Sequence, residues 1–524
     1  MSAIRNVLFV MCDQLRRDHL SCYGGRVPTP NLDALAARGV CFDEAYVQSG
    51  VCGPSRMSFY TGRYMSSHGA TWNRVPLSVA EPTLGDYLRT GGGGVALAGK
   101  SHVMPDDEGC ARFGIAPDSD RGVLLRAGGF AEIDRYDGHT PPGPVSGYAN
   151  WLRARGYASA DPWSDFVIAA DDHGQVVSGW QMRNAHLPAR VQEAHSETAY
   201  MTDVALAWIA AQGENPWVLH LSYVKPHWPY LAPAPYHALF RGGDMGKIVG
   251  PFVRSTQDGT ADEHPVLHAY RTHDECLSFG REDVARHVRP AYMGLVAQVD
   301  AHLGRVFKAL ETSGRRGDTL IVFTSDHGEF LGDRGLGEKE LFYDEIVRVP
   351  LIVADPDTRA DATRGRHDQR FVEAIDVVPT VLDALGRNRT AHRSEGRSLL
   401  PLLRGEPAQA WRDCVFSELD YSYRRARVVL GRRADACRGF MVRTVEWKYV
   451  DWQGFRPQLF DLARDPLELN DLGAAAGFER IRSELRERLF EWSTGLSRRT
   501  TVSDAQVEAR TDAHRRHGIH IGIW

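Results

Sequence analysis

Short apolar runs recur along the chain, and polar residues follow each of them. Runs of this length without alternation are typical of strands buried on both faces, as in parallel sheets. The predicted strands lie at 4–11, 40–46, 95–98, 217–223, 319–324 and 349–354. Helical periodicity fills the intervals, at 32–36, 82–89, 197–211, 281–313 and 376–385. This alternation predicts an α/β fold with a large, mostly parallel central sheet flanked by helices.

The pattern weakens in two stretches, 105–195 and 229–280, where Gly, Pro, Asp and Tyr are frequent. We expect both to be loop-rich insertions near the functional site, the first as a cover over it. Shorter strand-like runs and a final helix follow residue 390, at 415–419, 439–444, 447–450 and 479–492. The predicted organisation is a catalytic domain, a smaller C-terminal α+β subdomain with an antiparallel sheet, and a tail, at 1–390, 391–498 and 499–524.

Composition narrows the class of protein. The 524 residues are 43% hydrophobic and 25% charged, which is typical of a soluble globular protein. A net charge of −5 gives no reason to expect nucleic acid or an anionic membrane as a partner. No apolar run is long enough to cross a bilayer, and the first residues lack the features of a signal peptide, so we expect a cytoplasmic protein. None of the eight cysteines forms a CxxC pair, which favours free thiols.

Polar side chains gather where four of the apolar runs end. The four groups are Asp13-Gln14, Lys100 with His102, Lys225 with His227, and Asp326-His327. Ligands in open α/β sheets bind outside the carboxyl ends of the strands, so we expect the four groups to form one site. Asp13, Gln14, Asp326 and His327 offer oxygen and nitrogen ligands for one divalent ion. The oxygen-rich set favours calcium, magnesium or manganese, and the histidine leaves zinc or iron open.

Basic residues accompany these carboxylates in a mildly acidic protein. They are Arg56, Lys100, His102, His227 and Lys339. Together they predict a pocket for a compact, oxygen-rich anion such as sulfate, phosphate or phosphonate. Asn73 is a candidate for one further hydrogen bond to that anion.

Cys52 stands out among the cysteines. It follows a turn, and Pro54 suits the first turn of a helix, so Cys52 is predicted at a helix N-terminus. That position favours anions and activates thiols, although most cysteines are buried and unreactive. The residues alone leave an inert cysteine and a nucleophile as alternatives.

The segment Cys52-Gly53-Pro54-Ser55-Arg56, with Thr61-Gly62-Arg63 downstream, resembles the sulfatase signature. Asp-Gln, Gly-Lys-x-His, Pro-His-x-Pro and Ser-Asp-His-Gly occur around it in the order found in the sulfatase branch of the alkaline phosphatase superfamily. The stretch 458–472 resembles the C-terminal subdomain of that family. The resemblance covers nearly the whole chain and implies an alkaline-phosphatase-like fold.

The resemblance also implies a mechanism. A formylglycine-generating enzyme would oxidise Cys52 to formylglycine (3-oxoalanine), whose hydrate would bind the metal with Asp13, Gln14, Asp326 and His327. One hydroxyl would attack sulfur or phosphorus, giving a covalent hemiacetal intermediate. The remaining roles follow the family motifs: Arg56 would hold the formylglycine oxygens, Lys100 and Lys339 the transferred group, His227 would assist the leaving oxygen, and His102 would deprotonate the second hydroxyl.

Two positions depart from the common sulfatase pattern. Gln14 and His327 are similar to residues of the phosphonate monoester hydrolases and choline-sulfatase-like enzymes, whereas Lys100 and His102 are the sulfatase pair. The leading expectation is an arylsulfatase-type hydrolase of sulfate monoesters. The alternatives are a phosphonate monoester or phosphodiester hydrolase, a metal-dependent phosphatase using Cys52 as thiolate, and a non-catalytic anion-binding homologue.

The tail combines polar residues with an apolar end, Ile519 to Trp524, and contains His514, His517 and His520. A histidine metal site is one interpretation of this spacing. Docking of the apolar end on a neighbouring subunit is the favoured one, so we expect a homodimer or homotetramer.

Overall fold

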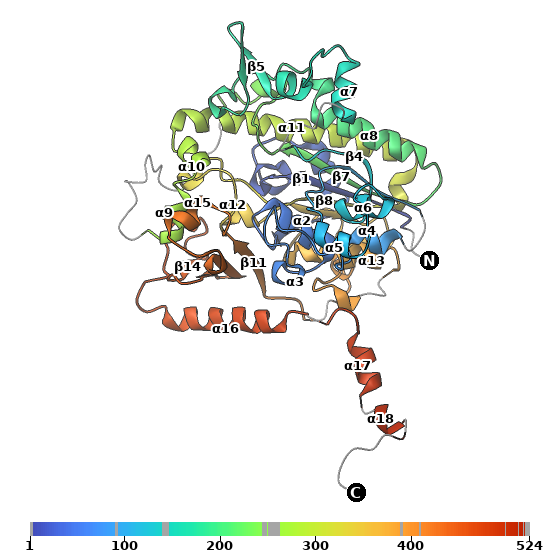
Figure 1. Ribbon diagram of the computed structural model, residues 1–524, viewed down its shortest axis with the longest axis vertical. Coiled ribbons are helices and arrows are strands. Elements are labelled where there is room, and N and C mark those ends of the chain that lie inside the picture. Colours follow the sequence, from blue (N-terminus) through green and yellow to red (C-terminus); the bar gives the residue numbers. More distant parts are fainter. Residues whose placement is uncertain are drawn as a thin grey trace.

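An eight-stranded sheet forms the centre of the computed structural model (Figure 1). The structure describes residues 4–89, 93–138, 146–243, 249, 263–387, 391–407, 410–497, 499–511, 513–516 and 518. The strand order is β10-β2-β9-β8-β1-β7-β3-β4. Their bounds are β1 Asn6–Asp13, β2 Val40–Tyr46, β3 Gly94–Gly99, β4 Ala131–Arg135, β7 Trp217–Pro226, β8 Thr319–Ser325, β9 Leu351–Ala354 and β10 Arg366–Glu373.

The sheet is mostly parallel, as predicted. β1 pairs in parallel with both β7 and β8, and β3 in parallel with β7. Only β9 among the described strands of this sheet runs against its neighbours, β2 and β8. Parallel strands align their carboxyl ends, so the polar residues that end β1, β3, β7 and β8 meet at one edge.

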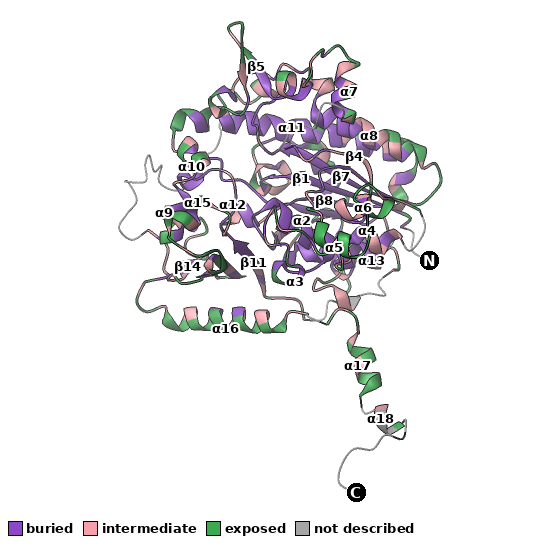
Figure 2. Ribbon diagram, viewed as in Figure 1, coloured by how far each residue is buried: buried purple, intermediate pink, exposed green. Residues whose placement is uncertain are grey.

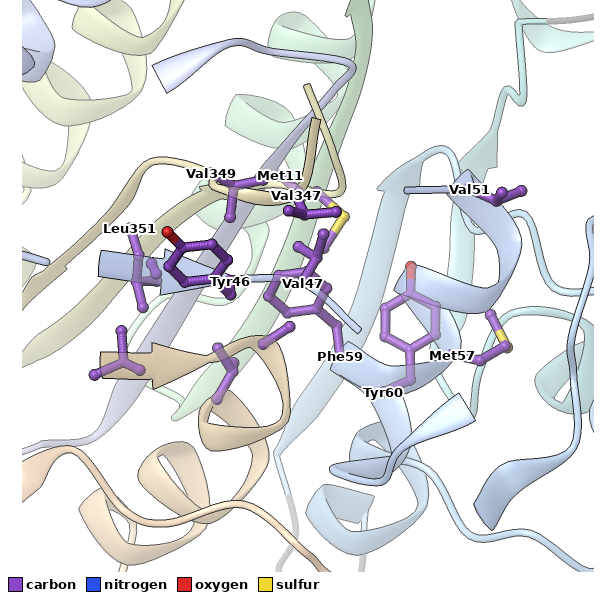
Figure 3. Close-up of a cluster of buried hydrophobic side chains, with 14 of the residues drawn as sticks. Met11, Tyr46, Val47, Val51, Met57, Phe59, Tyr60, Val347, Val349 and Leu351 are labelled. Carbon is purple, nitrogen blue, oxygen red and sulfur yellow. The ribbon is translucent and has the colours of Figure 1, made fainter. Parts of the chain in front are cut away.

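Helices cover both faces of the sheet, and β1 shows why. Leu8, Val10 and Cys12 pack with α8 (Glu197–Ala211) and α11 (Glu282–Thr312). Val7, Phe9 and Met11 alternate with them and pack on the other face with α2 (Cys52–Thr61) and α13 (Val377–Ala384). Because both faces of the strand are buried, its sequence is a continuous apolar run. Figure 3 shows Met11 beside Phe59 of α2, with Tyr46 and Val47 close by.

The remaining helices are short. On the described part of the chain they are α1 Pro30–Ala36, α3 Met65–His68, α4 Leu84–Arg89, α5 Asp107–Arg112, α6 Asp120–Arg126, α7 Gly147–Arg153, α9 Pro265–Tyr270, α10 Asp274–Phe279, α12 Asp344–Val347, α14 Leu400–Leu403 and α15 Arg425–Val429. Helix α2 differs from the others because all ten of its residues are buried. Figure 2 shows this burial in the middle of the molecule.

A second sheet follows near the C-terminus, antiparallel and four-stranded, in the order β11-β12-β13-β14. Its strands are β11 Cys414–Asp420, β12 Arg438–Thr444, β13 Trp447–Trp452 and β14 Gln458–Asp461. Helix α16 (Glu479–Gly495) packs on it through Leu485 and Leu489. Beyond α16, α17 (Asp504–Arg510) and α18 (Ala513–Arg516) extend away from the body (Figure 1). The apolar end at 519–524, His517 and His520 lie outside the described residues, as does the side chain of His514.

Five strands on the described part of the chain were not predicted: β4, β10, β14 and the two strands of a hairpin, β5 (Ala169–Asp172) and β6 (Gln175–Ser178), within 105–195. β4 and β10 are the two edges of the large sheet; no residue of β4 is buried, and the first five residues of β10 are polar and unburied. Edge strands carry solvated side chains, so they give no apolar run. The expectation that 105–195 is loop-rich is wrong in part, because it holds α5, α6, β4, α7 and the hairpin of β5 and β6.

No helix on the described part of the chain is both long and apolar enough to span a membrane.

Candidate active site

The four predicted strand-end groups converge at one edge of the large sheet. Asp13 ends β1, Asp326 and His327 follow β8, His227 follows β7, and Lys100 follows β3. These four strands are neighbours in the order β8-β1-β7-β3. Cys52, the first residue of α2, meets them there. All six side chains are completely buried.

Four of these residues form a cluster fit for a metal ion. The ligand atoms of Asp13, Cys52, Asp326 and His327 all lie within 4.8 Å of one another. Cys52 Sγ is 3.1 Å from His327 Nε2 and 3.9 Å from Asp13 Oδ1. Two carboxylates, one imidazole and a fourth group from Cys52 suit a divalent cation that accepts oxygen and nitrogen ligands.

The His327 ring is oriented for coordination. Its Nδ1 lies 2.8 Å from the carbonyl oxygen of Gly328, to which it must donate. The lone pair of the neutral ring is therefore on Nε2, which faces the cluster. Burial lowers the pKa of His327, with Lys339 acting in the same direction, and both effects favour this neutral form. A metal-binding histidine characteristically donates its other N–H in this way.

Gln14 presents its side-chain oxygen to the same site. Its backbone has φ 65°, in the left-handed region, and its N–H donates to Asp326 Oδ1 at 3.0 Å. The amide nitrogen donates to Glu329 and to the Tyr230 hydroxyl, at 3.3 Å for the latter. The amide oxygen accepts from Lys339 Nζ at 3.3 Å. Gln14 Oε1 is thus the atom available to a cation, and the role of Gln14 as a metal ligand stays a prediction.

Arg56 contacts the carboxylates of the cluster. Its Nε donates to Asp326 Oδ2 at 2.7 Å, and its Nη2 to Asp13 Oδ2 at 3.2 Å. Nη1 donates to the Lys100 carbonyl and to Ser222 Oγ, both at 2.8 Å. Burial opposes charge on Arg56, but the two carboxylates outweigh it and raise its pKa. The guanidinium therefore holds both carboxylates in place, whereas contact with the formylglycine oxygens stays a prediction.

Two lysines lie against the cluster. Lys100 Nζ is 2.5 Å from Asp13 Oδ2. Lys339 Nζ is 3.2 Å from His227 Nε2, and burial of its ammonium is outweighed by Cys52, Glu338 and Asp13, which raise its pKa. His227 Nδ1 lies 2.7 Å from the Trp228 carbonyl, so this nitrogen carries the proton and Nε2 accepts from Lys339.

The Cys52 thiol is completely buried at the N-terminus of α2. Burial raises the pKa of Cys52 to about 11, and Asp13 acts in the same direction against Lys339 and Lys100. Asn73 lies at the same helix end, where its Oδ1 accepts from the Gly53 N–H at 2.7 Å. Asn73 is an acceptor in this contact. Donation from its amide nitrogen to the bound anion stays a prediction.

His102 lies two residues beyond Lys100, in left-handed backbone with φ 56°. The carboxylate of Asp137 fixes this turn by accepting from the N–H groups of Ser101 and His102, at 3.2 and 3.1 Å. Partial exposure of His102 places it at the margin of the buried cluster. Its role as a base stays a prediction.

Glu329 and Tyr230 were not identified from the sequence, although both contact Gln14. Glu329 follows the Ser-Asp-His-Gly motif directly and is completely buried. Burial raises its pKa to about 7. The position of Glu329 directly after a ligand motif could have marked it as a site residue. Its partner Gln14 could not be identified in this way, because it lies 315 positions earlier in the chain.

Comparison with known proteins agrees with this geometry. The family model "Sulfatase" matches residues 5–387, and the model "N-sulphoglucosamine sulphohydrolase, C-terminal" matches residues 332–494. The chain is 32% identical over 520 residues to the multifunctional alkaline phosphatase superfamily protein PehA of Trinickia caryophylli, covering 95% of this chain and 96% of that protein. It is 26% identical to an arylsulfatase of Clostridium perfringens, covering 89% and 90% of the two chains.

Among solved structures, the phosphonate monoester hydrolase SpPMH of Silicibacter pomeroyi superposes with a TM-score of 0.82 at 28% identity, covering 96% of this chain and 98% of the other. The chain belongs to the sulfatase family, within the alkaline phosphatase superfamily, and has that superfamily's fold. It is a hydrolase of that family.

Proposed function

We propose that this chain is a metal- and formylglycine-dependent hydrolase of sulfate monoesters. The observation that carries the proposal is the buried cluster of Asp13, Cys52, Asp326 and His327, with ligand atoms within 4.8 Å, beside two buried lysines. An inert cysteine does not need such surroundings. A nucleophile that must contact a cation and an anion does.

The cation would supply charge to acidify and orient the nucleophile, and the formylglycine made from Cys52 would supply an aldehyde-hydrate hydroxyl as that nucleophile. Asp13, Asp326, His327 and Gln14 would hold the cation. Arg56 keeps the two carboxylates oriented, because it donates to one oxygen of each.

The two lysines suit the transferred group. A sulfate monoester has three terminal oxygens and one negative charge. A divalent ion, Lys100 and Lys339 make three cationic groups around it, and hydrogen bonds to charged partners are the strong ones. A phosphonate monoester carries the same charge but offers one terminal oxygen fewer, because carbon takes its place.

Departure of the ester oxygen needs a proton. His227 Nε2 accepts from Lys339 Nζ at 3.2 Å, so the proton nearest to this nitrogen is on the lysine ammonium. We assign the pair to the leaving oxygen, with Lys339 as the proton source and His227 as the group that orients it.

Phosphonate monoesters and phosphodiesters are the second candidate substrates. The similarity to SpPMH and to PehA favours them. All three ester types carry a single negative charge on a tetrahedral centre, so the buried cluster admits each of them. Steady-state rates on an aryl sulfate and on the matching aryl phosphonate monoester distinguish the two. We expect the larger kcat/KM on the sulfate, and a strong phosphonate preference would reverse the order of the candidates.

The state of Cys52 tests the chemistry shared by both candidates. Mass spectrometry of the peptide containing Cys52 should show a species lighter than the thiol form, because an oxygen replaces sulfur and two hydrogens are lost. Cys52→Ala should abolish turnover of every ester while the protein still folds, which circular dichroism checks. An active preparation that contains only the thiol would falsify the proposal, and so would an active Cys52→Ala variant.

A further inference from the structure

Two tryptophans continue the candidate active site toward the protein surface. The Trp228 ring centroid is 4.4 Å from that of His227, and Lys339 Nζ is 6.0 Å from the same indole. Trp180 then contacts Trp228, with ring centroids 5.3 Å apart and an interplanar angle of 60°. The indoles therefore begin at the pair assigned to the leaving oxygen.

Exposure rises along this series of contacts. His227 is 0% exposed, Lys339 7%, Trp228 partly exposed, and Trp180 45% exposed. A group attached to an oxygen beside His227 and Lys339 could extend along Trp228 toward Trp180, in the direction of increasing exposure. Trp180 is nearly half exposed, and exposed aromatic surface beside other aromatic rings is typical of a binding site.

Trp180 also contacts a buried ring. Trp163, 1% exposed, packs edge to face against Trp180 at a centroid distance of 6.1 Å. Trp180 follows the β5–β6 hairpin, at the top of Figure 1, and Gly179 N at the base of this hairpin donates to the Ile168 carbonyl at 2.6 Å.

Backbone contacts also join the hairpin to the segment after Trp228. Ala189 forms bridges with both Ala170 of β5 and Pro233, and its N–H donates to the Ala232 carbonyl at 3.0 Å. Two segments of separate sequence are therefore fixed side by side, so little ordering is needed when a ligand binds.

We propose that Trp180 and Trp228 form a leaving-group subsite that takes the aromatic ring of an aryl ester. The inference rests on the proposed function and adds the part of the substrate that is released. An aromatic ring fits because its faces and edges pair with two tilted indoles, whereas a short alkyl group has no ring to pair with them. Both tryptophans are specificity-determining rather than catalytic, because neither contacts the reacting centre.

The test compares phenyl sulfate with ethyl sulfate on the protein carrying formylglycine. Trp180→Ala should raise KM for phenyl sulfate by about three- to tenfold, the loss of one aromatic pair, with kcat nearly unchanged. KM for ethyl sulfate should not change. Trp180→Phe should recover most of the loss, because a ring remains. Val176→Ala is the matched control, since Val176 is 58% exposed on β6 of the same hairpin and should behave like the parent.

Equal effects of Trp180→Ala on both esters, or none on either, would overturn the subsite. Choline sulfate tests whether the two tryptophans bind a cationic leaving group instead of an aromatic one, because indoles also bind quaternary ammonium groups. A loss confined to choline sulfate would replace the aryl subsite with a cation subsite and overturn the proposal.

Ligand binding to a variant that cannot hydrolyse the ester tests the aryl subsite independently of the proposed function. Phenyl sulfate is titrated calorimetrically into the single variant Cys52→Ala and into the double variant that also carries Trp180→Ala. The Kd of the single variant should be about three- to tenfold lower than that of the double variant. Inorganic sulfate should bind both proteins equally. If no ester is hydrolysed but this difference holds, the proposed function fails and the aryl subsite stands. If hydrolysis occurs without this difference, the subsite fails alone.

Discussion

Gln14 shows how one side chain is fixed by partners that the sequence conceals. Its amide has two ends, and only the oxygen can bind a cation. Glu329 accepts from the amide nitrogen with Oε2, and Glu329 Oε1 accepts from the Leu331 N–H at 3.0 Å. Both oxygens of Glu329 are therefore acceptors, which sets the Gln14 oxygen toward Lys339.

Replacing Glu329 with Gln should weaken metal binding. A glutamine at 329 has one acceptor for two donors, so either Gln14 or Leu331 loses its partner, and the Gln14 amide is no longer held in one orientation. We expect the metal Kd to rise about tenfold or more, as for other residues that orient a metal ligand. Equilibrium dialysis with Mn²⁺ or Ca²⁺ measures it.

Glu418→Gln is the matched control for this experiment. Glu418 is equally buried and its pKa is likewise raised to about 7, but it lies on β11 and contacts Ser66. Its replacement should leave the metal Kd unchanged. Equal metal affinity in Glu329→Gln and the parent would show that Gln14 is oriented without Glu329.

Asp13 was predicted as a site residue from the sequence, whereas Glu329 was not. Asp13, Asp326, His227 and Lys100 were predicted to converge because each ends a buried run, and parallel strands end at a common edge. No such rule applies to Glu329 or Tyr230, whose contacts with Gln14 depend on side-chain directions set by the folded chain. The sequence likewise did not show that Arg56 holds the two carboxylates.

At the scale of elements, β11 joins the C-terminal sheet to the helices of the large one. Glu418 of β11 accepts from the Ser66 N–H of α3 at 2.9 Å and from the Ser66 hydroxyl. Val415 and Leu419 on the same strand belong to one apolar cluster with Phe42 of β2 and Phe59 of α2. A buried carboxyl group therefore lies at this junction.

Glu418 should make stability depend on pH. Burial raises its pKa from 4.5 to about 7 in the folded protein, so the folded state binds its proton more tightly than the unfolded state. The resulting stabilisation is complete below pH 4.5 and is lost as pH rises through about 7. In Glu418→Gln the group is neutral throughout. Its amide oxygen can accept from the Ser66 N–H and its amide nitrogen can donate to the Ser66 hydroxyl, so the free energy of unfolding should fall less over this range.

Urea unfolding at about pH 5 and about pH 8 measures this slope. Glu487→Gln provides the control, because Glu487 is exposed on α16 and its replacement should leave the slope of the parent unchanged. If the parent and Glu418→Gln lose stability in parallel, Glu418 is not the responsible group.

At the scale of the whole molecule, the two sheets share one hydrophobic core. Met441, Trp452 and Phe460 of the small sheet lie in the same buried cluster as Phe9 and Val322 of the large one. The antiparallel sheet was predicted from its short strand-like runs, but this sharing was not, because apolar residues of the small sheet give no indication of the surface on which they pack. The boundary at 390 stays a prediction.

Polar contacts also tie the small sheet to the segment that follows Lys339. Lys448 Nζ of β13 is 2.5 Å from Asp344 Oδ1, 2.6 Å from Glu468 Oε1 and 2.9 Å from the Phe342 carbonyl. Arg424, beside α15, is 3.0 Å from Glu340. Glu340 directly follows Lys339, so the C-terminal part of the chain contacts the segment that carries this lysine.

The shared core predicts that both sheets unfold together. Separating them would expose Met441, Trp452 and Phe460 and leave the carboxylates around Lys448 without their cation, at a cost of about 3–5 kcal/mol for the buried charges alone. Amide hydrogen exchange of the intact protein should therefore give the same opening free energy for peptides from β12 and from β1. Lys448→Met should lower both values equally. Exchange of β12 while β1 stays protected would show that the C-terminal sheet opens as a unit of its own, and that Lys339 can lose its support without unfolding of the rest.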